Sequence, residues 1–287
     1  MLNRNIETFL GCDKEYDVSR IVVFGAPFDS TTSYRPGTRF ASRTMRAESY
    51  GIETYSPYLD LDLEDTAVFD GGDLELCFGA PEKALAAIEE FTAEVLNDGK
   101  LPLMIGGEHL VTLGAVRAVA EKYQDLHVLH FDAHADLREE YLGAKLSHAT
   151  VLHRVWDIIG DGRIFQFGIR SGERAEFQWG KDHVATHKFD FSGLDEVIKQ
   201  LHDKPVYFTL DLDVLDPSVF PGTGTPEAGG VSFLELLGAC RKLDKLHIVG
   251  CDINELSPPY DQSGASTAVA LKIMREILLT LEKKHLK

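Results

Sequence analysis

LHFDAHAD, residues 129–136, joins an apolar run typical of a buried β-strand to a group of side chains that can bind metal ions. The group consists of Asp132, His134 and Asp136, which occupy alternate positions. Because alternate side chains of an extended segment point to the same face, these three should converge on one point. The stretch therefore predicts a strand that ends in two carboxylates and an imidazole.

TLDLD, residues 209–213, repeats this arrangement, with Asp211 and Asp213 at the end of another apolar run. Taken alone, either cluster is better explained by solvated charges where a strand ends. Two such clusters behind buried runs favour a shared site, in which five metal-binding side chains occupy a small volume. That much negative charge predicts a pair of divalent cations about 3.5–4 Å apart, which share carboxylates and activate a bridging water.

The same kind of apolar, β-branched run recurs along the chain and predicts further strands. The runs are continuous rather than alternating, which indicates strands covered on both faces. They lie at 20–25, 66–70, 101–107, 126–132, 163–168, 205–213 and 246–252. Helical patterns occupy 81–98, 111–123, 148–160, 193–202, 232–244 and 263–284. The alternation predicts an α/β fold with βαβ units and a mainly parallel sheet.

The chain shows no linker, low-complexity tract or internal repeat, so we expect one domain over residues 1–287. Its longest irregular stretches are 26–60, 137–147 and 214–231. Open α/β sheets bind ligands where their strands end. These stretches should therefore form the rim of a pocket around the metal-binding side chains.

Charge and cysteine usage narrow the class of protein. The chain has 29 basic and 46 acidic residues, for a net charge of −17. This balance argues against binding to nucleic acid or to an anionic membrane surface and suits a cationic substrate. The four cysteines are scattered without paired spacing and should be reduced thiols. No leader and no apolar run of roughly 20 residues is present, so we expect a cytoplasmic protein.

IGGEHL, residues 105–110, supplies a sixth ligand candidate, because its paired glycines allow the backbone to turn tightly before His109. A histidine in this position is more often a capping or core residue, but the five ligands already placed favour binding. Glu108 is the neighbouring alternative. Carboxylates and imidazoles without a thiolate disfavour a structural zinc site. Mn²⁺ fits best, and Zn²⁺, Co²⁺ and Fe²⁺ are also compatible.

Several motifs in order resemble the signature of the ureohydrolase family, which includes arginase, agmatinase and formiminoglutamase. They are GGEH at 106–109, DAHAD at 132–136, SH at 147–148, DLDVLDPSVFPGTGTPEAGG at 211–230 and DINELSP at 252–258. The match extends from about GAPFD at 25–29 to the C-terminal helix. This resemblance implies a three-layer α/β/α sandwich around a mainly parallel, eight-stranded sheet. It also implies a binuclear manganese centre that hydrolyses a guanidinium or amidine group, in a homo-oligomer such as a trimer or hexamer.

The resemblance also implies a role for individual residues. The metal ligands would be His109, Asp132, His134, Asp136, Asp211 and Asp213. Asp136 would also hydrogen-bond a metal-bridging hydroxide, Glu255 would hold the substrate guanidinium, and His148 would deliver a proton to the departing amine. Without the resemblance, His148 is equally well explained as a helix N-terminal residue beside its Ser147 cap, and Glu255 as a loop charge.

The choice of substrate depends on positions around these motifs. Arg138 and Leu146 stand where arginases carry asparagines that bind an amino-acid head group. SYRPGTRF at 33–40 and SPYLD at 56–60 resemble the agmatinase branch. We therefore expect hydrolysis of agmatine to putrescine and urea, a step in polyamine biosynthesis. The alternatives are guanidinobutyrate or arginine, whose carboxylate Arg138 could bind, and a non-catalytic, metal-stabilised protein that binds a guanidine or polyamine. A complete set of site residues favours the enzyme.

Overall fold

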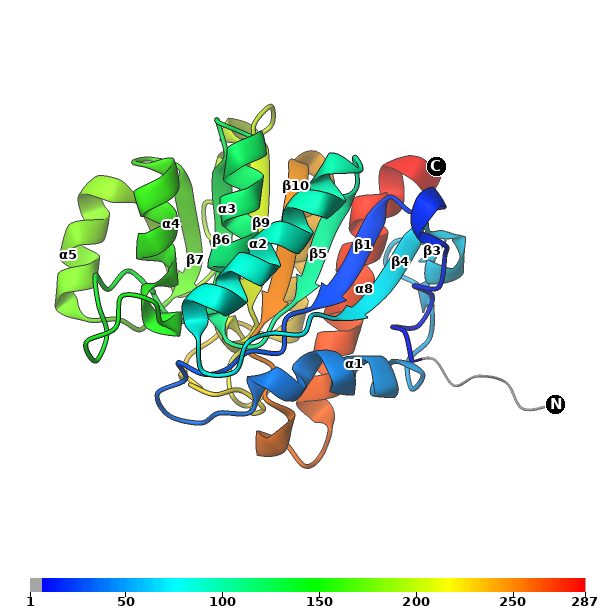
Figure 1. Cartoon of the computed structure of the whole chain (residues 1–287), viewed down its shortest axis with the longest axis horizontal. Coiled ribbons are helices and arrows are strands. Elements are labelled where there is room, and N and C mark those ends of the chain that lie inside the picture. The colour runs from blue at the N-terminus through cyan, green and yellow to red at the C-terminus, as the bar shows by residue number, and fades with distance from the viewer. Residues whose placement is uncertain (1–6, 287) are drawn as a thin grey trace.

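An eight-stranded sheet, parallel throughout, forms the centre of the computed structural model, which describes residues 7–286 (Figure 1). In spatial order the strands are β4 (Val68–Asp73), β1 (Ile21–Gly25), β5 (Leu101–Ile105), β10 (His247–Asn254), β9 (Pro205–Asp211), β6 (His127–Phe131), β7 (Ile164–Ile169) and β8 (Ala185–Lys188). A short antiparallel pair, β2 (Tyr55–Ser56) and β3 (Leu61–Asp62), lies outside this sheet. The expected eight-stranded, mainly parallel sheet is confirmed.

Helices cover both faces of the sheet, as the three-layer prediction requires. One face packs against α2 (Pro81–Asn97), α3 (Thr112–Lys122), α4 (Val151–Ile159) and α5 (Arg174–His183). The other packs against α1 (Ala41–Ser49), α6 (Leu194–Gln200), α7 (Phe233–Cys240) and α8 (Ala265–Leu286). Successive residues of a strand pack into the cores on opposite faces of the sheet. Val128 belongs to the core beneath α2–α5, and Leu129 belongs to the core on the other face. This two-sided burial explains why the strands appear in the sequence as continuous apolar runs.

Short 3₁₀ helices lie in the connections between these elements. They are η1 (Tyr16–Val18), η2 (Thr38–Phe40), η3 (Leu63–Asp65), η4 (His109–Val111), η5 (His148–Thr150), η6 (Leu212–Val214), η7 (Arg241–Lys245) and η8 (Pro258–Tyr260). Three of them, η4, η5 and η6, directly follow or contain the candidate site residues. None of the described helices is long and apolar enough to cross a membrane.

Three elements of the main layers were not predicted from the sequence, and neither was the short β2–β3 pair. The stretch 26–60, expected to be irregular, contains α1, whose buried Arg46 is held by ion pairs to Asp70 and Asp73 rather than by apolar contacts. The edge strand β8 has the half-exposed sequence ATHK and lacks an apolar run. The third is α5, in which the large apolar residues are Phe177 and Trp179. Hydrophobic periodicity cannot detect elements whose buried face is small or charged.

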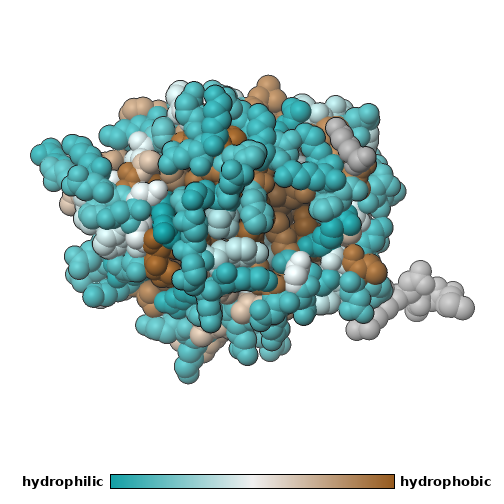
Figure 2. All heavy atoms as spheres, turned by 90° about the horizontal axis from the view of Figure 1, so that it is seen from above, coloured by the Kyte–Doolittle hydropathy of each residue, from teal (hydrophilic) through white to brown (hydrophobic). Residues whose placement is uncertain are grey.

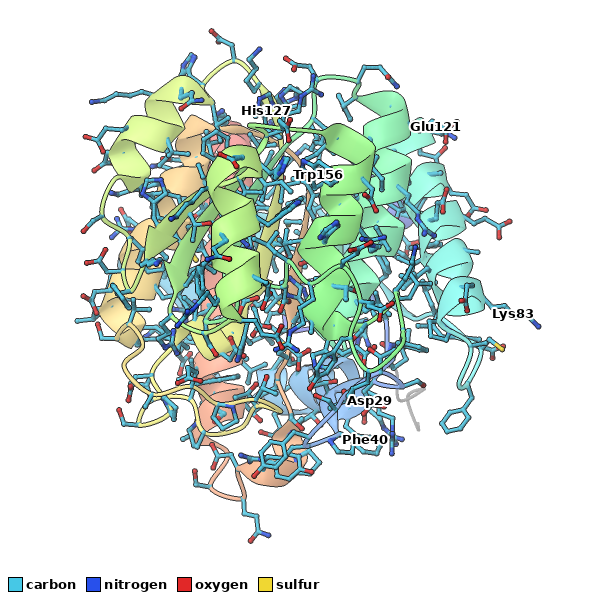
Figure 3. The ribbon with its side chains drawn as sticks, turned by 90° about the vertical axis from the view of Figure 1, so that its left-hand side faces the viewer. Asp29, Phe40, Lys83, Glu121, His127 and Trp156 are labelled. Atoms are coloured by element: carbon cyan, nitrogen blue, oxygen red, sulfur yellow. The ribbon has the colours of Figure 1, made fainter. Side chains whose placement is uncertain are left out.

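The two edges of the sheet differ in character. The strands end at the lower edge in Figure 1, among the long loops. Figure 3 shows Asp29 near this edge and His127 at the opposite one, where β6 begins. Seen from that opposite edge, the surface is mainly hydrophilic, and apolar side chains appear chiefly in its hollows (Figure 2).

Candidate metal centre and substrate cavity

Four neighbouring strands bring most of the candidate residues together. The strands β5, β10, β9 and β6 are adjacent in the sheet. Asp211 is the last residue of β9, Asp132 directly follows β6, and Glu255 directly follows β10. His109 begins η4, shortly after β5. Because all four strands are parallel, their carboxyl ends meet at one edge, and the two acidic motifs lie side by side as the sequence predicts.

His109 reaches this edge through a close approach of two backbones. A Cβ atom at Gly107 would lie 2.0 Å from the carbonyl oxygen of Phe28, so only glycine fits there. The buried ring of His109 places Nδ1 3.1 Å from Asp132 Oδ2, 3.0 Å from Asp136 Oδ2 and 3.7 Å from Asp211 Oδ2. One imidazole nitrogen therefore faces three carboxylates.

His134 forms a second group beside the first. Its Nδ1 lies 3.0 Å from Asp213 Oδ2 and 3.5 Å from Asp132 Oδ1. Asp132 is thus common to both groups. Within residues 7–286, the groups of three or more ligand atoms within 4.8 Å of one another are Asp132, His134 and Asp213, and His109, His130 and Asp132. Two groups that share a carboxylate match the arrangement needed for two neighbouring cations.

The orientation of His109 supports a metal rather than a plain hydrogen-bonding role. The Thr209 hydroxyl donates to Asp252 Oδ1 at 2.6 Å, so its oxygen accepts from the N–H at His109 Nε2, 2.9 Å away. In neutral imidazole the other nitrogen, Nδ1, then has a lone pair that faces the carboxylates. A metal ion bound by the carboxylates would meet this lone pair, and histidine ligands in proteins are commonly held by such a hydrogen bond. Without a metal ion a proton at Nδ1 takes that place: burial alone would lower the pKa of His109, but hydrogen bonds to Asp132 and Asp136 raise it well above its usual range.

The acidic groups perturb one another strongly. Burial, and then the charges of Asp213 and Asp132, raise the pKa of Asp211 well above its usual range. Burial and the charge of Asp132 raise the pKa of Asp136 to about 7. Burial would also raise the pKa of Asp132, but hydrogen bonds from His109, His130 and His134 hold it well below its usual range. Carboxylates that oppose one another's ionisation in this way are a favourable site for divalent cations.

Two site residues have strained backbones. Asp136 has φ of 53° and Glu255 has φ of 67°, in the left-handed region that favours glycine. Such residues cost about 1–3 kcal/mol each and concentrate at functional sites. The carbonyl of Asp136 accepts from the backbone N–H of Leu152, and the N–H of Glu255 donates to the carbonyl of Gly107. Nothing in the sequence signals this strain, because both residues are expected to favour other conformations.

Glu255 lines the cavity but is not among the carboxylates paired with the His109 or His134 ring. Its Oε1 accepts from the backbone N–H of His109 at 2.7 Å. Burial, and then the charge of Glu108, raise the pKa of Glu255 well above its usual range. Glu108 itself accepts hydrogen bonds from Thr31 and Thr32 and does not line the cavity. A cation placed beside Glu255 would relieve this electrostatic strain.

His148 lines the cavity at the start of η5, after the capping residue Ser147. Its Nδ1 lies 3.0 Å from the carbonyl oxygen of Thr31, which only accepts, so the ring proton is at Nδ1. Its Nε2 lies 3.3 Å from Ser33 Oγ on the cavity side. Burial, and then the charges of His134 and His109, lower the pKa of His148 to about 4. The ring is therefore neutral at pH 7, with Nε2 ready to accept a proton.

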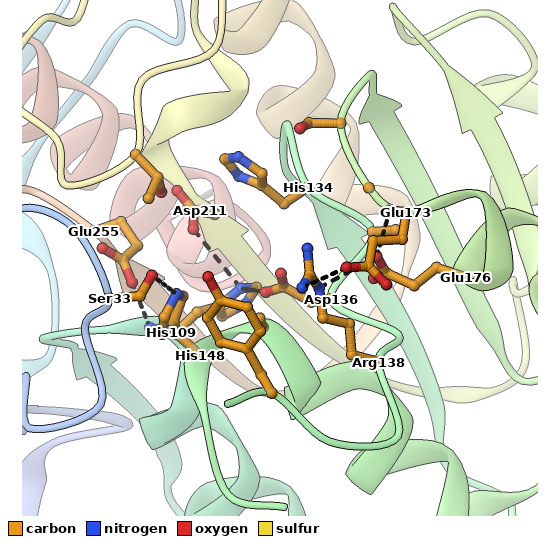
Figure 4. A pocket seen from close by; sticks show the side chains of 16 residues that line it. Ser33, His109, His134, Asp136, Arg138, His148, Glu173, Glu176, Asp211 and Glu255 are labelled. Atoms are coloured by element: carbon orange, nitrogen blue, oxygen red, sulfur yellow. Dashed lines mark hydrogen bonds and ion pairs between the residues drawn. The ribbon is translucent and has the colours of Figure 1, made fainter. Parts of the chain in front are cut away.

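A cavity of about 270 Å³ opens above these groups (Figure 4). Its rim comes from the 137–147 loop and from the start of α5. Arg138 Nη1 lies 2.9 Å from Glu173 Oε1, and its guanidinium stacks on the ring of Tyr141 with 4.4 Å to the centroid. Arg138 Nε also lies 3.5 Å from Glu176 Oε2. Arg138, which could have bound the carboxylate of an alternative substrate, is already paired with two acids.

Three positions differ from the interpretation based on the sequence. Leu146 does not line the cavity but packs against the core on the α2–α4 side. Glu173 and Glu176 do line the cavity, and sequence reasoning missed them. They form a capping box at the start of α5. The box begins with glutamate rather than with the usual Ser, Thr, Asp or Asn, so the sequence lacks the usual signature of a helix start here.

Comparisons with known proteins agree with this geometry. Residues 19–280 match the Arginase family. An agmatinase from Bacillus anthracis is 45% identical over 277 residues, which cover 95% of this chain and 96% of the relative. An agmatinase from Bacillus subtilis (strain 168) is 43% identical over 281 residues, which cover 96% and 97%.

A solved structure shows the same likeness in three dimensions. The crystal structure of a candidate agmatinase from Clostridium difficile superposes with a TM-score of 0.92 at 53% identity. The superposition covers 94% of this chain and 100% of that one. Because the match spans nearly the whole chain and confirms the resemblance carried by the motifs, the chain belongs to the arginase family.

Proposed function

We propose that the protein is a manganese-dependent agmatinase, which hydrolyses agmatine to putrescine and urea. The observation that carries the proposal is Glu255, a buried carboxylate that faces the cavity but is not among the carboxylates paired with the His109 or His134 ring. A guanidinium needs such an uncommitted partner beside the nucleophile. The agmatinases of Bacillus anthracis and Bacillus subtilis, each more than 40% identical to this chain, support the same substrate.

The chain offers a complete set of residues for two divalent cations. The ligands would be His109, Asp132, His134, Asp136, Asp211 and Asp213. Oxygen and imidazole ligands without thiolates suit Mn²⁺. Two bound cations would lower the pKa of a water molecule from about 15.7 toward ~7, which makes hydroxide available near neutral pH.

Three side chains, Glu255, Asp136 and His148, would carry out the remaining steps of the reaction. Glu255 accepts hydrogen bonds from the guanidinium and orients its carbon above Asp136, which accepts a hydrogen bond from the attacking water. The new carbon–oxygen bond forms as the bond from this carbon to the alkyl-bearing nitrogen breaks. Both protons of the attacking water pass to the departing amine, which leaves as an ammonium group. His148 is neutral, so its Nε2 takes up one of these protons and passes it to that amine. The products are urea and putrescine.

Rim charges account for the choice of agmatine over arginine. Glu173 and Glu176 line the cavity and favour an ammonium group, whereas an α-carboxylate would meet like charges there. Arg138 cannot compensate without giving up its ion pairs to the same glutamates. Burying a polar group without a hydrogen-bond partner costs about 1–3 kcal/mol. This cost corresponds to a preference for agmatine of about tenfold or more.

The decisive experiment measures urea release by the manganese-loaded protein with agmatine, arginine and guanidinobutyrate in parallel. The proposal expects the highest kcat/KM for agmatine. Equal or faster use of arginine would disprove the substrate assignment while leaving the hydrolase chemistry intact. Absence of urea with all three substrates from protein that binds two metal ions would favour a non-catalytic guanidine-binding role.

Other features of the proposal need their own measurements. We expect a cytoplasmic homo-oligomer, a trimer or hexamer, in which residues 1–287 form one domain. Light scattering coupled to size-exclusion chromatography determines the assembly, and cell fractionation determines the compartment. Elemental analysis of protein purified without added metal identifies the native ion.

A further inference from the structure

A row of polar side chains crosses the sheet beneath the metal-binding groups. His130 of β6 pairs in register with Gln166 of β7, which pairs with Thr186 of β8. In-register neighbours on parallel strands point to the same face of the sheet, so the three side chains form a line. His130 and Gln166 are fully buried. Polar groups so deep in a core must be satisfied by hydrogen bonds.

The hydrogen bonds along this row determine the position of each proton. Gln166 Nε2 lies 2.7 Å from the carbonyl oxygen of Ala135, which only accepts, so that atom is the amide nitrogen. Its remaining N–H faces His130 Nδ1 at 3.1 Å. The amide oxygen accepts from the Thr186 hydroxyl at 2.9 Å. His130 Nδ1 is thus an acceptor, and the N–H of neutral imidazole must be at Nε2.

His130 Nε2 lies 2.8 Å from Asp132 Oδ2. The other oxygen of Asp132, Oδ1, accepts from the backbone N–H of His134 at 2.6 Å. Each oxygen of this carboxylate therefore has a donor from the chain itself. Asp132 is also the residue shared by the two metal-binding groups. A hydrogen bond that orients this carboxylate orients the ligand common to both cations.

We propose that His130 is a positioning residue for the metal centre: the chain Thr186–Gln166–His130 holds an N–H on Asp132 and fixes the orientation of that ligand. The inference rests on the proposed function, because it assumes that Asp132 binds metal. His130 lies close enough to His109 and Asp132 to be counted as a ligand. The proton positions exclude that role, since Nε2 carries the proton and Nδ1 receives the Gln166 amide.

The test compares two substitutions of His130 by their affinity for Mn²⁺, measured by isothermal titration calorimetry. His130→Phe keeps the ring shape and removes the donor. His130→Gln places an amide N–H as many bonds from the backbone as the original Nε2. Loss of such a supporting hydrogen bond lowers metal affinity roughly 10–100-fold. We expect that loss in His130→Phe, substantial recovery in His130→Gln, and two ions per chain in both at saturation.

His127 offers a matched control on the same strand. It is also mostly buried, and its Nδ1 lies 2.8 Å from the carbonyl oxygen of Asp125, at the edge remote from the cavity (Figure 3). His127→Phe makes the same chemical change and should leave Mn²⁺ affinity unchanged. If His130→Phe does not fold, Gln166→Leu leaves the histidine in place and should produce a smaller loss of affinity.

The outcomes separate the inference from the function on which it rests. Parental affinity in His130→Phe or Gln166→Leu would overturn the positioning role. A fall from two ions to one in both His130 variants would show that His130 is a ligand, which also overturns it. Failure of the unsubstituted protein to bind Mn²⁺ would instead contradict the proposed metal centre.

Discussion

The floor of the cavity comes from the ends of four neighbouring strands, whereas its rim comes from the 137–147 loop and the start of α5. Floor residues such as Asp132 and Asp211 are buried and both lie within 4 Å of His109 Nδ1. Rim residues such as Glu173 are exposed, and their ion pairs meet solvent. Charges interact far more strongly in the floor, because water screens the rim. Substitutions in the floor should therefore abolish function, and substitutions in the rim should adjust it.

The largest effect is expected from the shared carboxylate in the floor. Asp132→Asn removes a negative charge from both metal-binding groups, so metal content should fall from two ions per chain. The rate of urea release should fall by more than the roughly 10²–10⁴-fold that is lost when one catalytic acid or base is removed. Elemental analysis and urea release measure the two effects. Asp182→Asn, an exposed change of the same kind on α5, is the control. Two ions in fully active Asp132→Asn protein would remove Asp132 from the centre.

His148 lies where floor and rim meet, and its substitution should affect the rate but not the metal. In His148→Asn the departing amine has no proton relay, so kcat should fall roughly 10²–10⁴-fold while both ions stay bound. Single-turnover urea release and metal analysis on the same sample check this. A variant with full turnover would exclude His148 from the mechanism.

The pH dependence of the unsubstituted enzyme tests the same residue. Burial lowers the pKa of His148 to about 4. Above this pH the ring is neutral and accepts a proton, and below it the ring is already protonated. The contribution of His148 to kcat should therefore stay constant down to about pH 5. It should be lost as the pH falls through about 4, because the ring becomes protonated. An acid limb near about 6.5 that disappears in His148→Asn would show that the ring titrates at its ordinary pKa.

Glu173 should produce a graded effect typical of the rim. In Glu173→Gln the cavity loses one negative charge and Arg138 loses a partner. The preference for agmatine over guanidinobutyrate, measured as the ratio of kcat/KM values, should fall by no more than about fivefold, because an exposed ion pair is worth about 0.2–1 kcal/mol. Glu139→Gln, exposed on the 137–147 loop but not lining the cavity, should leave the ratio unchanged. A larger fall of this ratio in Glu173→Gln would mean that charges in the rim interact as strongly as those in the floor.

The smallest effect is expected at Tyr141, whose ring stacks under Arg138 and meets His148 edge-on at 5.9 Å between centroids. Tyr141→Leu removes a partly exposed cation–π contact worth about 0.5–1 kcal/mol. Chemical denaturation should show a loss of that size in the free energy of unfolding, with kcat changed less than a few-fold. A drop in kcat as large as that of His148→Asn would show that Tyr141 belongs with the floor.

Floor and rim also differ in how well they could be predicted from the sequence. The six ligand candidates and Glu255 directly follow strands or lie in short turns, so a local motif identifies each one. In the rim, Leu146 turned out to pack into the core, and Glu173 and Glu176 were missed. Their place at the cavity depends on how α5 docks against a loop distant in the sequence.

The sequence by itself determined the fold class and the chemical character of the floor, because apolar runs and alternate ligand positions are properties of neighbouring residues. Only the tertiary structure decided the elements α1, α5 and β8, the strained backbones of Asp136 and Glu255, and the row from Thr186 to His130. These features arise from the register between strands and from packing between distant segments. A proton on one nitrogen of His130 follows from an amide on the next strand, and no local pattern carries that information.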